Sequence, residues 1–181
     1  MVSQIKVNEI IKQSGSSISI GESGDTINIA GSAYAAAGDN TPSFGAYLNA
    51  NQSISHNTTT KINFNAEYWD TDGKFDTSNN RFTPTIAGKY FFNSSLRYDN
   101  GASYEVTLYI YKNGSEFIKV RFKQNASVET IQITGILELD TDDYVEIYGR
   151  QAQGGSVSVN GDTNGTDGVT ARFFGYKLNG V

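Results

Sequence analysis

The residues of this chain that could carry chemistry are one histidine and several groups of acidic side chains. His56 lies in a polar stretch, residues 53–58, and it is the only histidine of a chain without cysteine. A zinc site needs several His, Cys or carboxylate ligands, and a Ser-His-Asp triad needs partners that no spacing here brings to His56. We therefore interpret His56 as a solvated loop residue and not as a metal ligand or a general base.

Residues 70–76 begin like the calcium-binding loop of an EF-hand, with aspartates at the first and third positions. The fifth position is Lys74, however, the glycine is misplaced, and the twelfth position is Arg81 where the loop requires glutamate. We therefore reject an EF-hand in this segment.

Two further turns are rich in side-chain oxygen and are the remaining candidates for a metal site. Carboxylate and amide oxygens are the ligands that Ca²⁺ prefers. Turn-forming aspartate and asparagine explain the same composition without a metal, and we favour that interpretation. We therefore predict no catalytic residue and no cofactor, with calcium as the one candidate ion. The candidate calcium ligands are Asp140, Asp142 and Asp143 in the first turn, and Asp162 and Asp167 in the second.

The elements that position these turns are short strands with alternating apolar residues. In residues 82–92 a Pro…Gly turn leads into alternating aromatic residues, which indicates a corner followed by a strand with one buried face. Pro84 cannot donate to a sheet, so it belongs at a strand end. The chain has 19 Gly and 2 Pro, many aromatic and β-branched residues, and no long apolar stripe of helical period. We therefore predict an all-β fold.

Strand patterns follow one another closely from residue 44 onward. Asn113 and Gly114 form a dipeptide typical of a two-residue hairpin turn, and residues 140–143 form another turn. Segments 69–82 and 153–168 are rich in Gly, Asn, Asp and Ser, and we predict loops and turns there. Eight or more strands with short turns imply a sandwich or a barrel. The predicted strands are residues 44–48, 61–65, 88–98, 104–112, 117–122, 128–139, 144–148 and 169–178.

Residues 1–42 differ in composition and are predicted to be a separate segment. Ile18 and Ile20 form an alternating apolar pair that Ile27 and Ile29 repeat nine residues later. Burial of four isoleucines at about 1.5–3 kcal/mol each cannot offset an ordering cost of about 1–2 kcal/mol per residue in one chain. We therefore expect an extended β-rich stalk in which three copies intertwine, with a flexible leader as the alternative. Residues 43–181 form the second domain.

The charge and the apolar pattern exclude several classes of function. The net charge is −5 with dispersed Lys and Arg, so no basic face for nucleic acid is predicted. No apolar run reaches membrane-spanning length, so we expect no membrane insertion. The first residues lack the hydrophobic core of a signal peptide, so we expect no export by the ordinary secretory route. Without cysteine the chain has neither disulfides nor thiolate chemistry.

A series of short motifs runs in a fixed order over residues 44–178. The motifs are Phe44-Gly-Ala, Ile62-Asn-Phe-Asn65, Tyr68-Trp-Asp70, Phe82-x-Pro84, Gly88-x-Tyr90-x-Phe92, Leu108 with Lys112-Asn113-Gly114, and Phe173-Phe174-Gly175-Tyr176. Their order resembles that of the C1q/TNF-like jelly-roll family. The family usually places glycine where this chain has Asp142, a departure that could change the shape of that turn and any ion site in it.

The resemblance implies a ten-stranded jelly-roll sandwich that assembles as a homotrimer around an apolar axis. Two runs of consecutive large apolar residues, 90–92 and 108–111, support an interface between copies of the chain. In a strand with one face in the core of a single chain, every second side chain of such a run would point into water, and an interface would cover these side chains. Scattered surface aromatics are the alternative interpretation. The candidates for the trimer axis or core are Tyr90, Phe91, Phe92, Tyr109, Tyr111, Phe174 and Tyr176.

The leader, with I-K-V-N followed by I-x-I units after Ser-Gly, resembles segments of phage fibre proteins. Together the two resemblances imply a structural virion protein, a trimeric head or tail fibre whose knob contributes to host attachment. We expect residues 1–42 to bind other virion proteins, and loops 99–103, 124–127 and 153–168 to bind a host-surface glycan or protein. The alternatives are a cellular or bacterial C1q-like secreted or surface protein and, with least support, a polysaccharide depolymerase, which would need two carboxylates in a cleft.

Overall fold

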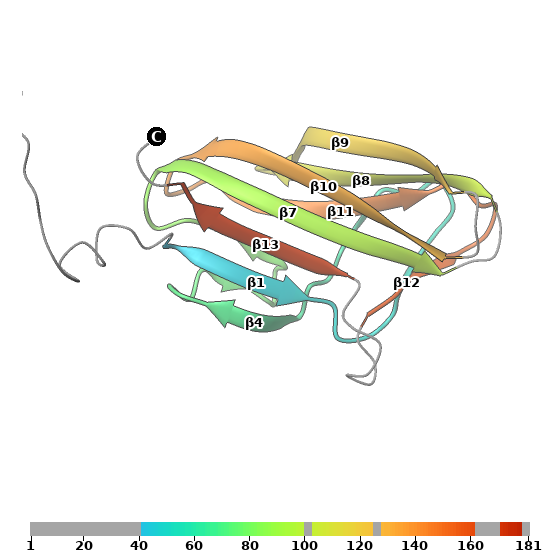
Figure 1. Cartoon of the computed structure of the whole chain (residues 1–181), viewed down its shortest axis with the longest axis horizontal. Coiled ribbons are helices and arrows are strands. Elements are labelled where there is room, and N and C mark those ends of the chain that lie inside the picture. The colour runs from blue at the N-terminus through green and yellow to red at the C-terminus, as the bar shows by residue number, and fades with distance from the viewer. Residues whose placement is uncertain (1–40, 100–102, 125–127, 162–170, 179–181) are drawn as a thin grey trace, which may run out of the picture. The chain divides into compact units, whose positions relative to one another are not determined.

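A computed structural model of the 181-residue chain describes residues 41–99, 103–124, 128–161 and 171–178 (Figure 1). All regular elements in this part of the chain are β-strands, which confirms the predicted all-β class. The predicted stalk lies outside the described residues except for positions 41 and 42, so the domain boundary stays a prediction. The strands are β1 (Ser43–Tyr47), β2 (Gln52–Ile54), β3 (Thr60–Lys61), β4 (Ala66–Asp70), β5 (Phe75–Asp76), β6 (Arg81–Phe82), β7 (Gly88–Asp99), β8 (Tyr104–Lys112), β9 (Ser115–Gln124), β10 (Val128–Leu139), β11 (Val145–Gln151), β12 (Val157–Val159) and β13 (Arg172–Lys177).

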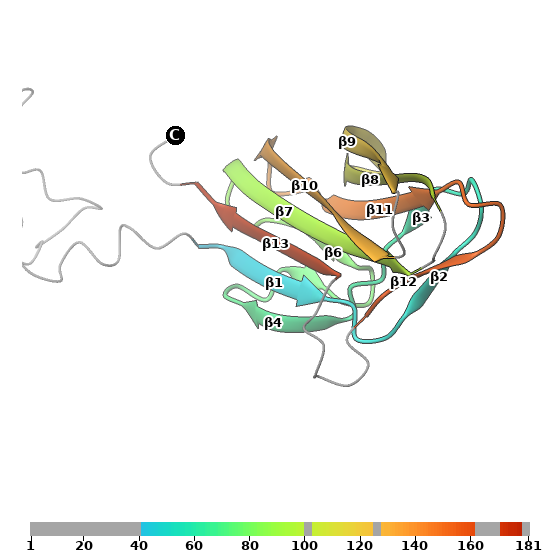
Figure 2. The ribbon, with the colours of Figure 1, turned by 45° about the vertical axis from the view of Figure 1, so that its right-hand side comes forward.

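The strands form two antiparallel sheets that face each other as a sandwich. Sheet A has seven strands, in the order β2-β12-β7-β13-β1-β4, and β10 pairs along the opposite side of β7. Sheet B has six strands, in the order β5-β6-β11-β8-β9, with β3 paired to β11. Among the described strands, β9 and β10 each pair on one side only, and they contact each other along one side of the sandwich (Figures 1 and 2). This arrangement confirms the predicted jelly-roll sandwich.

Alternating side chains of both sheets build the core. On β7 the even-numbered residues point inward, and Tyr90 and Phe92 are fully buried. Phe44 of β1 lies among the core aromatics, with its ring centroid 4.6 Å from that of Phe82 and 4.9 Å from that of Phe173. Burial of each such side chain stabilises the fold by about 1.5–3 kcal/mol. The corner predicted at residues 82–92 is confirmed, because it carries the chain from β6 into β7 and this core.

Gly175 of β13 is required by the packing of this core. A Cβ at this position would lie 2.6 Å from the ring of Phe44 and 2.7 Å from the ring of Phe92. Both rings are fully buried in a close-packed interior, so neither can move aside without disturbing its neighbours. The glycine of the last motif therefore has a packing role.

Four strands lie wholly or partly in segments that the sequence predicts to be loops and turns, so the prediction was wrong there. The second half of β4 and the two-residue strands β5 and β6 fall in the predicted segment 69–82, and β12 falls in the predicted loop 153–168. β12 has three residues and pairs with β2 and the end of β7, whereas β4 pairs with β1 across a register shift. Such short strands depend on partners far away in the sequence, which local composition does not reveal.

Candidate functional site

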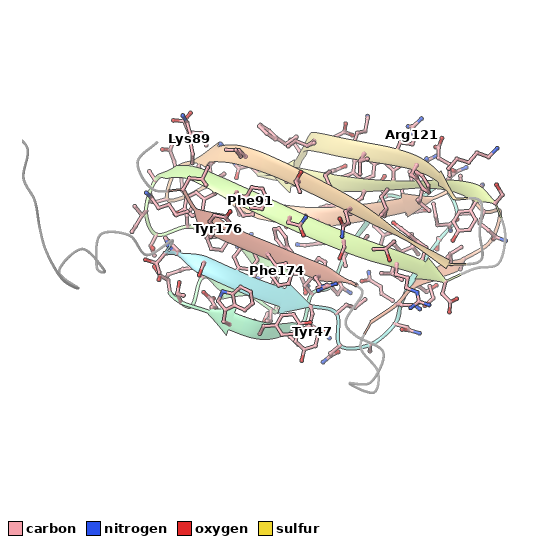
Figure 3. All side chains as sticks on the ribbon, viewed as in Figure 1. Tyr47, Lys89, Phe91, Arg121, Phe174 and Tyr176 are labelled. Carbon is pink, nitrogen blue, oxygen red and sulfur yellow. The ribbon has the colours of Figure 1, made fainter. Side chains whose placement is uncertain are left out.

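The outer face of sheet A carries a row of apolar side chains across three adjacent strands. Ile136 of β10, Phe91 of β7 and Tyr176 of β13 are direct cross-strand neighbours. Figure 3 shows Phe91 and Tyr176 on adjacent strands, with 5.2 Å between their ring centroids. Ile136 is 56% exposed. We call these three residues the apolar row. A contiguous apolar surface of this kind is typical of a contact site for a partner.

A group of aromatic rings continues this face toward the edge strand β4. Tyr68 and Trp69 are consecutive in the sequence, yet each is 47% exposed, because the register between β1 and β4 shifts in the middle of β1. Such a bulge sets two residues against one, so that side chains no longer alternate strictly. The ring of Tyr68 lies 4.6 Å from that of Tyr47, and the Trp69 indole lies 5.5 Å from the ring of Phe174. We call these four residues the aromatic platform, of which Figure 3 labels Tyr47 and Phe174.

Gly45 of β1 leaves the space in which Trp69 and Phe174 stack. A Cβ at Gly45 would be 2.6 Å from Cζ3 of Trp69 and 2.9 Å from Cδ1 of Phe174. The two rings are nearly parallel, with 10° between their planes. The indole therefore has one face on Phe174, while nearly half of the Trp69 residue remains exposed.

The open edge between β9 and β10 forms a second apolar surface. Phe122 of β9 is 45% exposed at this edge, and Phe117 of the same strand is 53% exposed at the bulge beside Tyr111. Residues of β9 and β10 line a hollow of about 400 Å³ beside this edge. Its lining residues are Val120, Arg121, Phe122, Thr130, Ile131 and Gln132. The edge and the outer face of sheet A are thus two separate apolar surfaces of one chain.

The outer face of sheet B carries tyrosines among charged residues. Tyr111 stacks on Tyr148 with ring centroids 4.2 Å apart, and Tyr109 meets Tyr111 edge to face at 5.9 Å. Tyr148 donates a hydrogen bond to Glu146, which also pairs with Lys61. Burial and the Glu146 carboxylate raise the pKa of Tyr148 to about 12, so this hydroxyl stays protonated at neutral pH. Tyr109 is only 6% exposed, so the side chains of this face largely cover one another.

The seven predicted axis or core candidates lie in three different places. Two belong to the core of the sandwich, three lie on the outer face of sheet A, and two lie on the outer face of sheet B. In that order they are Tyr90 and Phe92; Phe91, Phe174 and Tyr176; and Tyr109 and Tyr111. The group on sheet A lies beside the strongly exposed Ile136 and Trp69.

Sequence reasoning missed four residues of that face, namely Ile136, Tyr47, Tyr68 and Trp69. The alternation within residues 128–139 could have shown that Ile136 points away from the core, but its position opposite Phe91 depends on the pairing of β10 with β7. The bulge that exposes Trp69 leaves no comparable signal, since it arises from pairing between β1 and β4.

The first candidate calcium turn is closed by an ion pair. Asp143 accepts hydrogen bonds from the ammonium of Lys112 at 2.8 Å, the side-chain amide of Asn113 at 2.6 Å and the backbone N–H of Asp140 at 2.7 Å. The hydrogen bond from Lys112 is the main cause that lowers the pKa of Asp143 to about 2. A fixed cation thus lies where calcium would approach this carboxylate. Asp140 and Asp142 are exposed, and this geometry does not support a calcium site at the turn.

The other acidic groups give no metal site within the part of the chain that the structure describes. Asp162 and Asp167 lie outside the described residues. No three His, Cys, Asp or Glu side chains among the described residues are grouped to hold a metal ion. In the 70–76 segment the carboxylates cap turns, since Asp70 accepts from the backbone N–H of Phe75 at 2.7 Å and Asp76 accepts from that of Ser78 at 2.9 Å.

His56 is exposed and joins two loops. Its Nδ1 accepts a hydrogen bond from the backbone N–H of Gly154 at 2.9 Å. Nearby, Gln151 is fully buried and donates to the carbonyls of Ile54 at 2.9 Å and Gly155 at 2.8 Å. These bonds hold the first residues of the predicted recognition loop 153–168, whose later part lies outside the described residues, as do most of loops 99–103 and 124–127.

The sequence and the fold were compared with known proteins. The C1q domain family matches residues 43–175. The fold is similar to the globular domain of the zebrafish complement 1qA protein, with a TM-score of 0.50 and 16% identity over 76% of this chain and 98% of that one. It is also similar to the Eiger TNF from S. frugiperda, with a TM-score of 0.56 and 10% identity over 77% of this chain and 92% of that one. These low identities support the fold alone.

Over 98 residues the chain is 34% identical to the phage-like element PBSX protein XkdV of Bacillus subtilis (strain 168). The match covers 49% of this chain and 14% of XkdV, so the chain corresponds to a small part of that relative. No helix in the described residues is long and apolar enough to span a membrane. C1q/TNF-like domains are typically binding or structural modules that form trimers. With its two-sheet jelly roll and a family match over residues 43–175, this chain belongs to the C1q domain family.

Proposed function

We propose that this protein is a homotrimeric structural component of a phage particle, a fibre or appendage whose C1q-like domain contributes to attachment to the host surface. The likeness to XkdV, a protein of a phage-like element, supports the assignment to a virion. Membership of a family whose domains form trimers supports self-association.

The observation that carries the proposal is the pair of separate apolar surfaces on one chain. The apolar row lies on the outer face of sheet A, whereas Phe122 lies at the open edge between β9 and β10. Contact between the face of one copy and the edge of the next is heterologous, and three such contacts close a ring when each copy is rotated by about 120°. A ring of this kind covers both surfaces in every copy and would account for the exposed Ile136 and Phe122.

The two parts of the chain have different roles in this proposal. Residues 1–42 form the stalk and bind other virion proteins, and the C1q-like domain faces the host. Three identical sites on one rigid trimer gain by avidity, because the second and third contacts form at a high effective concentration. Weak individual contacts with a host glycan or protein are therefore sufficient for attachment.

The second candidate function is that of a cellular or bacterial C1q-like protein that is secreted or displayed at a cell surface. The fold of the complement 1qA globular domain favours this reading. A collagen stalk would mark the complement type, but no Gly-x-y repeat occurs in this sequence.

Antibody labelling of the purified particle separates the two candidates. Antibodies against the C1q-like domain should label a fibre or appendage in electron micrographs. Purified full-length chain, added to host cells before the particle, should reduce adsorption because it occupies the same surface sites. Unlabelled particles, together with recovery of the chain from the surface or medium of uninfected cells, would reject the virion assignment.

A further inference from the structure

We propose that the aromatic platform is a glycan-binding site that stacks a pyranose ring on the indole of Trp69. The inference rests on the proposed attachment role, and it names the chemistry of the host ligand and the residues that contact it. It places this contact on β4 and its neighbours, and not on loops 99–103, 124–127 and 153–168.

The rings of the platform hold one another in place. The Trp69 indole stacks on Phe174, with 5.5 Å between the centroids and 10° between the planes. Tyr68 packs on Tyr47 at 4.6 Å and lies 6.3 Å from Trp69. Gly45 is needed for this stack, since a Cβ there would lie 2.6 Å from Trp69. Rings that are already fixed lose little conformational freedom when a ligand stacks on them.

The exposed part of the platform suits one face of a sugar. Tyr68 and Trp69 are each 47% exposed, and they are adjacent on one surface. An aromatic face carries negative potential, whereas one face of a pyranose ring presents C–H hydrogens with partial positive charge, so the two surfaces attract each other. Stacking also removes the apolar area of both partners from water.

Polar groups lie beside the platform on the same face. Arg172 of β13 is the cross-strand neighbour of Tyr47 and precedes Phe174 by two residues. Arg172 is exposed, and no ion pair within the described residues involves it. Its guanidinium can donate several N–H groups to sugar hydroxyls or to an acidic group on the same glycan. An apolar surface with a few placed polar groups is the usual composition of a small-ligand site.

The position of the platform favours a glycan over a second copy of the chain. β4 lies three strands away from β7 in sheet A, which is about 14 Å at about 4.8 Å per strand. A sugar residue needs only the exposed face of one or two rings. The apolar row therefore serves the second copy, and the platform serves the glycan.

Trp69 is the only tryptophan of the chain, so its fluorescence reports on the platform directly. The full chain is screened on a panel of pyranose oligosaccharides that contains neutral hexoses, N-acetylhexosamines and uronic acids, and each sugar that binds is titrated. Binding should shift the Trp69 emission to the blue and reduce its quenching by iodide. Either neutral or acidic sugars support the stacking site. A preference for uronic acids that Arg172→Ala removes assigns the acidic contact to Arg172.

Variants separate the platform from the rest of the surface. Trp69→Ala should weaken binding about tenfold or more, because an aromatic anchor carries a large share of the binding energy, and Trp69→Phe should retain part of the affinity. Gly45→Val should also weaken binding, because it displaces the indole while leaving the tryptophan in the chain. The matched control is Ile86→Ala, which removes an exposed apolar side chain in the turn between β6 and β7 and should leave the affinity unchanged. The mass and Tm of each variant show that assembly and folding are intact.

Three results would overturn the glycan site. One is equal binding by Trp69→Ala and the wild type, and another is a wild type that binds no sugar of the panel. The third is a sugar-free trimer in which Trp69 already has blue-shifted emission and resists iodide, because the indole would then lie between copies. Failure of the virion assignment looks different: the particle carries no label, while Trp69-dependent sugar binding persists.

Discussion

Acidification should weaken the fold through Asp143 in the turn between β10 and β11. In the folded protein its carboxylate lies 2.8 Å from the Lys112 ammonium, and its pKa is about 2 instead of the ordinary 3.8, chiefly because of this hydrogen bond. The folded state thus keeps the proton off a group that the unfolded chain protonates near pH 4. The stabilisation is complete above that pH and is lost as the pH falls from about 4 toward 2.

The size of this contribution follows from the pKa difference and the exposure of the pair. The gap between 3.8 and about 2, at about 1.4 kcal/mol per pH unit, corresponds to about 2.4 kcal/mol. The side chains of Lys112 and Asp143 are 27% and 12% exposed, so water screens part of the interaction. We therefore expect the pair to contribute about 1–2 kcal/mol to the free energy of unfolding.

Urea unfolding of the wild type and Asp143→Asn at pH 7, 4 and 2 tests this expectation, at one protein concentration because association adds to stability. Asp143→Asn should be less stable by about 1–2 kcal/mol at pH 7, and the difference should shrink as the pH falls to 2. The matched control is Asp142→Asn, an exposed neighbour in the same turn, which should change stability by less than about 0.5 kcal/mol. Two results would refute the role given to the Lys112–Asp143 pair. One is an equal free energy of unfolding for the wild type and Asp143→Asn at pH 7, and the other is a difference between them that is the same at pH 7 and pH 2.

Three further substitutions test the core, one loop and the contact between copies. Gly175→Ala places a methyl group against two buried rings and should lower the free energy of unfolding by about 1–3 kcal/mol in urea, whereas an unchanged midpoint would contradict the packing argument. Gln151→Leu leaves buried carbonyls without their donor, which should lower the free energy of unfolding by about 1–3 kcal/mol and speed amide hydrogen exchange in residues 152–157. Unchanged exchange would show that Gln151 does not hold this loop. Phe91→Asp puts a charge into the proposed contact and should yield monomers in analytical ultracentrifugation, while Ile86→Asp should remain trimeric. A trimeric Phe91→Asp would place the contact elsewhere.

The strands with strong alternation could be predicted from the sequence. Residues 88–98 alternate between aromatic and other residues, and β7 buries Tyr90 and Phe92 while its odd-numbered residues point outward. Asn113 and Gly114 both have positive φ, as the predicted hairpin turn requires. Local pattern was sufficient here because each strand has one face in the core and each turn depends on its own residues.

The candidate surfaces could be predicted only in part, because they depend on which strands pair. Alternation indicates that the side chains of Phe91 and Tyr109 point away from the core, because their neighbours in the sequence point into it. It does not indicate that the two residues lie on the outer faces of different sheets. The exposure of Trp69 comes from a bulge between β1 and β4, and the ion pair of Asp143 comes from the approach of two hairpin turns. These contacts join residues far apart in the sequence, and no local pattern encodes them.

Association of three copies through the outer face of sheet A is the central claim, and the mass of the full chain in solution tests it most directly. Sedimentation equilibrium at micromolar concentration should give about 59 kDa, three times the 19.7 kDa of one chain. A stable, folded species of 19.7 kDa at that concentration would contradict both the trimer and the proposed attachment by three identical sites.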